Sequence, residues 1–333
     1  MDREEVFHNE IEELLRKRIG LNPSSVGSRA VLRAVKKGLR QSGLSELSDY
    51  CAQLKASPAL FDALVESIVV LETSFFRNRV SYVFLRQWIN DEWKKRTSGA
   101  AHRPLRVLSL PCSTGEEPYS IAITFLEEGL GLGDFHIDGI DVSTAALERA
   151  EKGVFSPYAF RRQTYRKNDK YFSLVAPAQD SASGFKLCDP TDLETDLGNR
   201  RPIRYKLKDS VREKVIFRQG NVLDAQLLMD EPPYDIVFCR NMLIYFDRMA
   251  RDRTFSFLNR VLRPDGLLFT GYAETGLIDV EQYQPVPYPQ TFTFYKRSSL
   301  SPARCSNESE EQGRDRLEVD LEKVHAKTKR SIL

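Results

Sequence analysis

The loop that follows the apolar run 107–110 combines two carboxylates with a single glycine. Gly115, Glu116 and Glu117 stand directly before Pro118, which is typical of the first turn of a helix. A dinucleotide-binding loop needs several glycines, so that backbone N–H groups can approach a pyrophosphate. Two carboxylates would instead repel phosphate and favour a cation. The loop therefore indicates a nucleoside that carries an ammonium and a sulfonium, such as S-adenosylmethionine, in preference to NAD or ATP.

Two further polar side chains follow predicted strands and could contact such a nucleoside. Asp141 ends the strand predicted at 136–140, where a carboxylate can accept hydrogen bonds from both ribose hydroxyls. Asp141 could instead cap the helix that comes next, since Ser143 follows closely. Asn221 follows the strand predicted at 215–218, where its amide could contact the adenine edge or could simply form a turn.

Arg77 and Tyr245 could orient a carboxylate substrate. Arg77 lies where the helical part of the chain joins the part with strands, and a guanidinium there suits bidentate binding of a carboxylate. A surface cation is the usual alternative for an arginine. Tyr245 lies one turn past the strand predicted at 235–239, where a substrate would approach, although a tyrosine between Ile and Phe is commonly part of a core. Arg240 and Asn241 directly follow the same strand.

A predicted helix near the N-terminus carries a cationic face. Its basic residues lie opposite Leu32, Val35 and Leu39, and the acidic residues expected one turn away are missing. Such a face could simply be solvated, or it could dock an acidic partner. The basic residues are Arg29, Arg33, Lys36, Lys37 and Arg40.

Hydrophobic periodicity separates a helical first part from an alternating second part. Residues 1–75 are predicted to form a small bundle of four amphipathic helices. The strands are then predicted at 106–110, 136–140, 215–218, 235–239 and 267–270, with helices at 120–128, 145–151 and 250–262. Two last strands, at 283–286 and 291–295, should form an antiparallel pair. This order predicts an α/β fold with a doubly wound, mostly parallel sheet.

Two segments fall outside this pattern. Residues 171–199 are rich in Asp, Ser, Pro and Gly and are predicted to be a loop-rich insertion, followed by a strand that carries Ile203, Tyr205 and Leu207. The tail 298–333 is polar and of mixed charge, and it is predicted to be disordered.

Composition narrows the class of protein. The 333 residues carry a net charge of +2 and are 41% hydrophobic, which is typical of a soluble globular protein with no overall field for nucleic acid. Five scattered cysteines without a CxxC pair indicate reduced thiols, a cytoplasmic location and no zinc site. No signal peptide and no membrane-spanning run is apparent. We therefore expect a cytoplasmic monomer that holds no metal and does not insert into a membrane.

Three segments resemble the motifs of the CheR-type chemoreceptor methyltransferases. They are Glu-Thr-Ser-Phe-Phe-Arg at 72–77, Cys-Ser-Thr-Gly-Glu-Glu-Pro-Tyr-Ser at 112–120 and Cys-Arg-Asn-Met-Leu-Ile-Tyr-Phe at 239–246. The resemblance covers roughly residues 5 to 297. It implies a seven-stranded, Rossmann-like methyltransferase sheet in residues 76–297, with a helical N-terminal domain (1–75) and a small inserted β-subdomain whose enlarged loop lies at about 171–214.

The resemblance also implies an activity and a set of site residues. Members of the family use S-adenosylmethionine to form methyl esters on acidic, helical glutamate sites of bacterial receptors, and release S-adenosylhomocysteine. Arg77 and Tyr245 would lie nearest to the methyl transfer, and the cationic helix would face the receptor. The residues implied around the cofactor are Thr73, Arg77, Glu117, Asp141, Asn221, Val222, Arg240 and Asn241.

Two departures and two alternatives accompany the resemblance. Leu71 stands where the family often has Asn, which removes one polar contact to the cofactor. The insertion at 171–199 stands where the enterobacterial members have a compact turn that binds a receptor peptide. The alternatives are a methyltransferase of the same fold that acts on another protein or a small molecule, and a non-catalytic module that senses the cofactor. Transfer to an ionised glutamate needs no general base, so positioning should dominate the rate enhancement.

Overall fold

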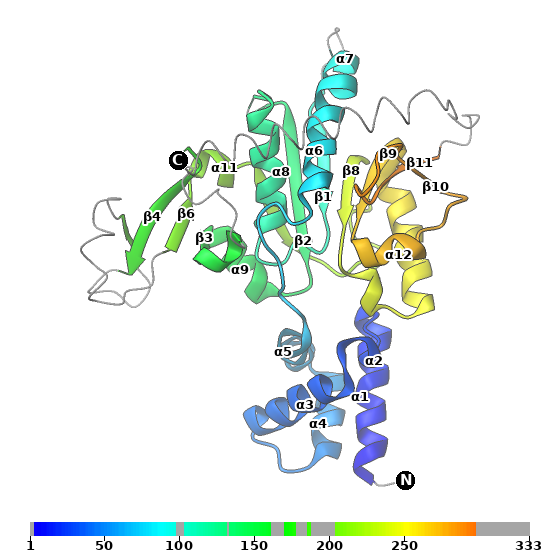
Figure 1. Ribbon diagram of the computed structural model, residues 1–333. Coiled ribbons are helices and arrows are strands. Elements are labelled where there is room, and N and C mark those ends of the chain that lie inside the picture. Colours follow the sequence, from blue (N-terminus) through cyan, green and yellow to red (C-terminus); the bar gives the residue numbers. More distant parts are fainter. Residues whose placement is uncertain are drawn as a thin grey trace.

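The computed structural model describes residues 3–97, 103–131, 133–160, 170–177, 185–187 and 204–297. The tail 298–333 and most of the insertion at 171–199 lie outside these residues. A helical part at the N-terminal end lies below a larger part built on a β-sheet in Figure 1. Within the described ranges, no helix is long and apolar enough to cross a membrane.

The helical part is a small bundle with its own apolar core. Leu15, Tyr50 and Leu64 are fully buried in this core, each from a different helix. Ser57 accepts a hydrogen bond from the backbone of the last helix, and Pro58 occupies its first turn, so the chain can turn sharply between the last two helices. The helices are α1 (Arg3–Ile19), α2 (Pro23–Val26), α3 (Ser28–Ser42), α4 (Leu47–Ala56) and α5 (Pro58–Ile68).

Seven strands form the central sheet in the order β10-β11-β9-β8-β1-β2-β7. The five strands from β9 to β7 are parallel, and β11 and β10 continue the sheet as antiparallel strands. The predicted doubly wound sheet with an antiparallel edge is confirmed. The strands are β1 (Leu105–Ser109), β2 (Phe135–Asp141), β7 (Val215–Gln219), β8 (Tyr234–Cys239), β9 (Leu262–Thr270), β10 (Tyr283–Pro285) and β11 (Thr293–Lys296).

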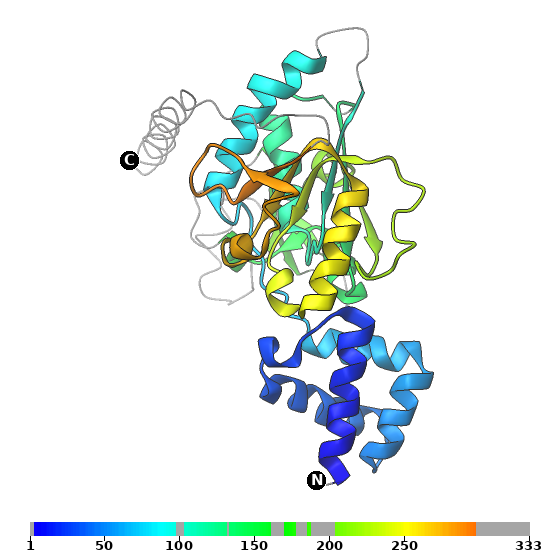
Figure 2. The ribbon, with the colours of Figure 1, turned by 90° about the vertical axis from the view of Figure 1, so that its right-hand side faces the viewer.

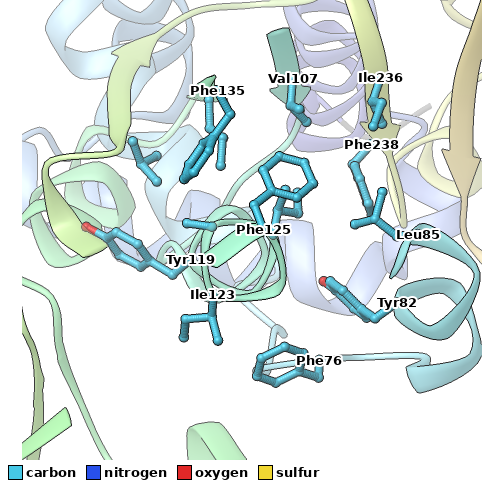
Figure 3. Close-up of a cluster of buried hydrophobic side chains, with 14 of the residues drawn as sticks. Phe76, Tyr82, Leu85, Val107, Tyr119, Ile123, Phe125, Phe135, Ile236 and Phe238 are labelled. Carbon is cyan, nitrogen blue, oxygen red and sulfur yellow. The ribbon is translucent and has the colours of Figure 1, made fainter. Parts of the chain in front are cut away.

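Helices cover both faces of this sheet, because successive strand residues point to opposite sides. Val107 and Ile236 belong to the core that α6 and α8 cover (Figure 3), whereas Leu108 and Val237 belong to the core beneath α12. Figure 2 shows α12 and the pair formed by α6 and α8 on opposite sides of the strands. The helices of this part are α6 (Arg79–Trp88), α7 (Lys94–Thr97), α8 (Glu116–Glu127), α9 (Thr144–Lys152), α11 (Asp209–Arg212) and α12 (Arg248–Val261). A π-helical turn (Ile89–Trp93) joins α6 to α7.

A second, antiparallel sheet lies beside the first, in the order β3-β6-β4-β5. Its strands are β3 (Val154–Phe155), β4 (Phe172–Pro177), β5 (Phe185–Leu187) and β6 (Arg204–Leu207). The strand expected at 203–207 is present as β6, and β4 and β5 lie inside the segment 171–199 that we expected to be rich in loops. Phe172 and Val175 of β4 are buried, and the ring of Phe172 lies 5.2 Å from that of Phe160. Packing of these apolar side chains outweighs the polar composition of the insertion.

The segment that joins the bundle to the sheet is held by two phenylalanines. Phe75 is fully buried and stacks on Phe160 with ring centroids 4.9 Å apart. The backbone N–H of Phe76 donates to Ser120 Oγ of α8 at 2.9 Å. Both phenylalanines therefore anchor this segment to the sheet part of the protein, and Arg77 follows directly after them.

Candidate functional site

A crevice lies where the parallel strands end, at the point where the chain changes direction across the sheet. The chain extends the sheet from β1 through β2 to β7 on one side, and later through β8 and β9 on the other. Ligands of such sheets bind outside the carboxyl ends of the strands at this switch point. The crevice holds about 800 Å³ of empty space, part of it open to solvent, and the bundle contributes one wall with Ile19, Leu21, Val26 and Ile68. It also contains five of the predicted site residues: Asp141, Asn221, Val222, Asn241 and Tyr245.

The loop between β1 and α8 forms the floor of this crevice. Gly115 ends the loop with φ of +92°, and a Cβ atom there would lie 2.8 Å from Cβ of Ala150 in α9. Only glycine therefore allows α8 to begin so close to α9. Ser113 lines the crevice, and its Oγ is buried without a hydrogen-bond partner among the described residues.

Asp141 lies at the end of β2 with its carboxylate against this loop. Its Oδ2 accepts from the backbone of Ser113 at 2.7 Å and its Oδ1 from the backbone of Ser143 at 3.0 Å. The alternative of a helix cap is taken by Ser143, whose Oγ accepts from the backbone of Ala146. Burial raises the pKa of Asp141, and its two backbone donors oppose that rise. Each carboxylate oxygen keeps a lone pair that a ribose hydroxyl can use.

Glu66 joins the bundle to this side of the crevice, and no sequence pattern pointed to it. From α5, its carboxylate accepts hydrogen bonds from Ser143 Oγ at 2.6 Å and from the backbone of Ala145 at 3.1 Å. The negative charge of Glu66 also contributes to the raised pKa of Asp141, after the larger effect of burial. The bundle therefore contacts the site through polar groups as well as through its apolar wall.

Asn221 both forms a turn and lines the crevice. Its Oδ1 accepts from the backbone of Leu223 at 3.0 Å, which is the turn that the sequence offered as an alternative. Its amide Nδ2 donates to the carbonyl of Arg18, the last residue but one of α1. This bond ties the end of α1 to the loop after β7.

Glu117, Arg240 and the backbone of Arg77 form a second polar group. Glu117 accepts from Ser109 Oγ at 2.8 Å and pairs with Arg240 Nη1 at 3.0 Å, and Arg240 Nη2 donates to the carbonyl of Arg77 at 2.9 Å. The side chains of Arg240 and Glu117 are 2% and 12% exposed. Burial raises the pKa of Glu117, and the charge of Arg240 opposes the rise. Arg240 Nε has no partner among the described residues.

The two loop carboxylates therefore have partners inside the protein. Thr114 Oγ1 donates to Glu116 at 2.7 Å, and burial raises the pKa of Glu116. Neither Glu116 nor Glu117 is among the residues that line the crevice, whereas Asp141 is. Of these three carboxylates, Asp141 at the end of β2 is the one that lines the crevice, and the charge of Glu117 is offset by Arg240.

Arg77, Thr73 and Tyr245 complete the set of predicted residues. Arg77 is half-buried, and its Nη1 donates to the carbonyl of Glu72 at 2.8 Å. Thr73 is half-buried in the same connecting segment, while Leu71 lines the crevice. Tyr245 is half-buried, packs against both the bundle core and the core beneath α12, and accepts a backbone hydrogen bond from Asn22 at 2.7 Å. It therefore combines the packing role with a place in the crevice.

The family model and the relatives that match this chain are all methyltransferases. The family model described as "CheR methyltransferase, SAM binding domain" matches residues 71–182 and 196–291. The chain is 40% identical over 296 residues to the probable biofilm formation methyltransferase WspC of Pseudomonas aeruginosa, covering 89% of this chain and 63% of that protein. It is 37% identical to WspC of Pseudomonas putida, covering 86% of this chain and 61% of that protein.

A third relative is matched over about two thirds of its own length. Chemotaxis protein methyltransferase 2 of Vibrio cholerae is 31% identical over 228 residues, which cover 67% of this chain and 68% of that protein. By contrast, this chain spans less than two thirds of the length of the two WspC proteins. The family model matches more than half of the chain and includes the crevice loop, Asp141, Asn221 and Tyr245. The chain therefore belongs to the CheR methyltransferase family and carries its S-adenosylmethionine-binding domain.

Proposed function

We propose that this protein is a methyltransferase that forms glutamyl methyl esters on a chemoreceptor-like protein. Membership of the CheR family and the names of the chemotaxis relatives support the reaction. The observation that carries the choice of an acidic protein substrate is the cationic face of α3. All of its basic residues are exposed, and none forms an ion pair with a described residue. They are Arg29, Arg33, Lys36, Lys37 and Arg40.

The residues of the crevice fit S-adenosylmethionine. The lining of the crevice is largely apolar with a few polar groups, as small-molecule sites require. Ser113 Oγ is an unpaired polar group that a ligand can satisfy, and Asp141 presents a buried carboxylate with free lone pairs. Asp141 would hold the ribose, Asn221 and Val222 would contact the adenine, and the apolar wall from the bundle would exclude water.

When bound, S-adenosylmethionine supplies a methyl group on a sulfonium, whose transfer to a carboxylate oxygen breaks the sulfur–methyl bond and leaves a neutral thioether. An ionised glutamate is already a nucleophile, so the protein has no proton to remove. Arg77 would orient the acceptor carboxylate with its guanidinium fork. Tyr245, which lines the crevice, would restrict the directions from which that carboxylate can approach. Arg240 keeps Glu117 neutralised, so that no unpaired negative charge repels the acceptor.

The ionisation of Asp141 should control cofactor affinity. Burial raises the pKa of Asp141, so the carboxylate takes up a proton at a higher pH than an exposed aspartate does. The affinity for S-adenosylhomocysteine, measured by calorimetry, should therefore fall as the pH is lowered, and the fall should begin at a higher pH than an exposed aspartate would produce. Asp141→Asn should weaken binding at pH 8 by about tenfold to a hundredfold, the loss of a hydrogen bond to a charged group. A variant that keeps the pH dependence of the wild type would contradict this role of Asp141.

The cationic face of α3 should govern acceptor binding rather than transfer. Arg33→Glu with Lys37→Glu should raise KM for the acidic acceptor on the order of tenfold and leave kcat unchanged, with a smaller effect at high salt. The matched control reverses an exposed Lys and Arg on α7, Lys95→Glu with Arg96→Glu, at the far end of the molecule (Figure 1). Equal KM values for the two double variants would exclude docking through α3.

The proposed reaction has a direct test. The protein is incubated with S-adenosylmethionine labelled with tritium in the methyl group, together with a candidate receptor or a bacterial lysate. Label that base releases as methanol identifies a carboxyl methyl ester, and we expect this result. Base-stable label would indicate a methyltransferase with another acceptor group. Binding of the cofactor without any transfer would indicate a sensing module.

A further inference from the structure

We propose that Glu274 is a positioning residue for the methyl transfer, a role that rests on the function proposed above. Glu274 lies in the 3-10 turn after β9 (Tyr272–Leu277), and its side chain is completely buried. It belongs to none of the three motifs that suggested the site. Its carboxylate holds the backbone of the segment that carries Arg240, Asn241 and Tyr245.

The carboxylate of Glu274 accepts four backbone hydrogen bonds. Its Oε2 accepts from the N–H groups of Asn241 and Gly271, both at 2.7 Å. Its Oε1 accepts from Met242 at 2.7 Å and from Leu243 at 2.8 Å. An ionised carboxylate has about four lone-pair positions, and here each of them is used. Within the described residues Glu274 forms no ion pair, and its four hydrogen-bond donors are all backbone N–H groups.

These bonds fix a conformation that the chain would not hold by itself. Asn241 has φ of +60°, in the left-handed region that a residue other than glycine adopts only at a cost. On one side of Asn241, Arg240 directs its guanidinium to Glu117. On the other side, the turn Leu243–Tyr245 brings Tyr245 to the crevice. A hydrogen bond to a charged group is roughly twice as strong as a neutral one, so a single carboxylate can hold the backbone at Asn241 in this conformation.

The site of Glu274 requires a carboxylate of this length and leaves no spare space. In Glu274→Gln, one carboxylate oxygen becomes an NH2 group that faces backbone N–H donors and can accept from none of them. Gly271 offers an independent way to disturb the same contact. Its backbone conformation suits alanine, but a Cβ atom there would lie 2.6 Å from Glu274 Oε2 and 3.1 Å from Asn241 Nδ2. Gly271→Ala therefore moves the carboxylate while keeping every polar group.

Asp235 provides a matched control for the loss of a buried carboxylate. It lies on β8, near the opposite end of the strand from Arg240, and is 6% exposed. It pairs with Arg103 and accepts from the backbone of Arg106 at 3.0 Å. Asp235→Asn should therefore lower stability without touching the segment that follows β8.

The experiment compares kcat, KM and thermal stability of Glu274→Gln, Gly271→Ala and Asp235→Asn in the full chain. We expect Glu274→Gln to lower kcat at least tenfold and Gly271→Ala to lower it several-fold, at temperatures well below unfolding. KM for S-adenosylmethionine should change less than threefold, because Asp141 and Asn221 are held by other contacts. Asp235→Asn should keep kcat within twofold of the wild type, even if its melting temperature falls as far as that of Glu274→Gln.

Amide hydrogen exchange of residues 241–243 gives a readout that does not need activity. Both site variants should lose protection there, and Asp235→Asn should not. The proposal is overturned if Gly271→Ala keeps the kcat and the protection of the wild type, or if Asp235→Asn lowers kcat as much as Glu274→Gln. If Glu274→Gln does not fold, Gly271→Ala decides. A wild-type protein that transfers no methyl to any acceptor would overturn the proposed function, and the exchange result would still decide whether Glu274 holds the segment.

Discussion

Replacing Arg77 with alanine should lower kcat for methyl transfer by about a hundredfold to a thousandfold, as the loss of one fixed hydrogen-bond donor at a reacting group does in other enzymes. The half-buried guanidinium uses Nη1 to bond the carbonyl of Glu72, which limits its freedom and leaves its other N–H groups for an acceptor carboxylate. In the proposed reaction the protein acts mainly by positioning, so losing the group proposed to orient the nucleophile should affect kcat more than cofactor affinity.

Arg79→Ala is the control for Arg77→Ala. Arg79 is exposed, lies two residues further along the chain at the start of α6, and should be replaceable without loss. Arg77→Lys should recover only part of the activity, because lysine keeps the charge but not the fork. Turnover of Arg77→Ala within a few-fold of the wild type, under conditions where Arg79→Ala is also active, would remove Arg77 from the site.

The frame of this site could be predicted because its signals are local. Each strand of the parallel sheet is a short apolar run, and Asp141 and Asn221 directly follow such runs. Once the order of strands and helices indicates a doubly wound sheet, the ends of its strands must meet at one edge. The sequence therefore located the crevice, and it assigned to it five residues that the structure places there.

The partners of the charged residues could not be predicted, because they come from distant parts of the chain. Glu117 and Arg240 are 123 positions apart, and Glu66 and Ser143 are 77 apart. No periodicity relates such positions, so the sequence did not indicate that Glu117 pairs with Arg240 within the protein. Glu274 was missed for the same reason, since its four partners are backbone groups that carry no signal in the sequence.

The pairing of Glu117 with Arg240 leads to the largest expected effect on stability. Arg240→Ala leaves a buried carboxylate without its cation, and breaking a buried pair in this way costs about 3–5 kcal/mol of the free energy of unfolding. The pKa of Glu117 is already raised by burial, and removing Arg240 should raise it further. A carboxyl group whose pKa is higher in the folded chain than in the unfolded chain stabilises the fold at pH values below its unfolded-chain pKa. This stabilisation is lost as the pH rises through the folded-chain pKa.

The loss in Arg240→Ala should therefore be larger at pH 8 than at pH 5, because a carboxyl group with a raised pKa takes up a proton more readily as the pH falls. Urea unfolding at the two pH values measures this difference. Adding Glu117→Gln to Arg240→Ala removes the unpaired charge, so the double variant should recover part of the stability at pH 8 and lose the extra pH dependence. Equal losses for the single variant at both pH values would show that Glu117 stays charged, or reaches water, once Arg240 is gone.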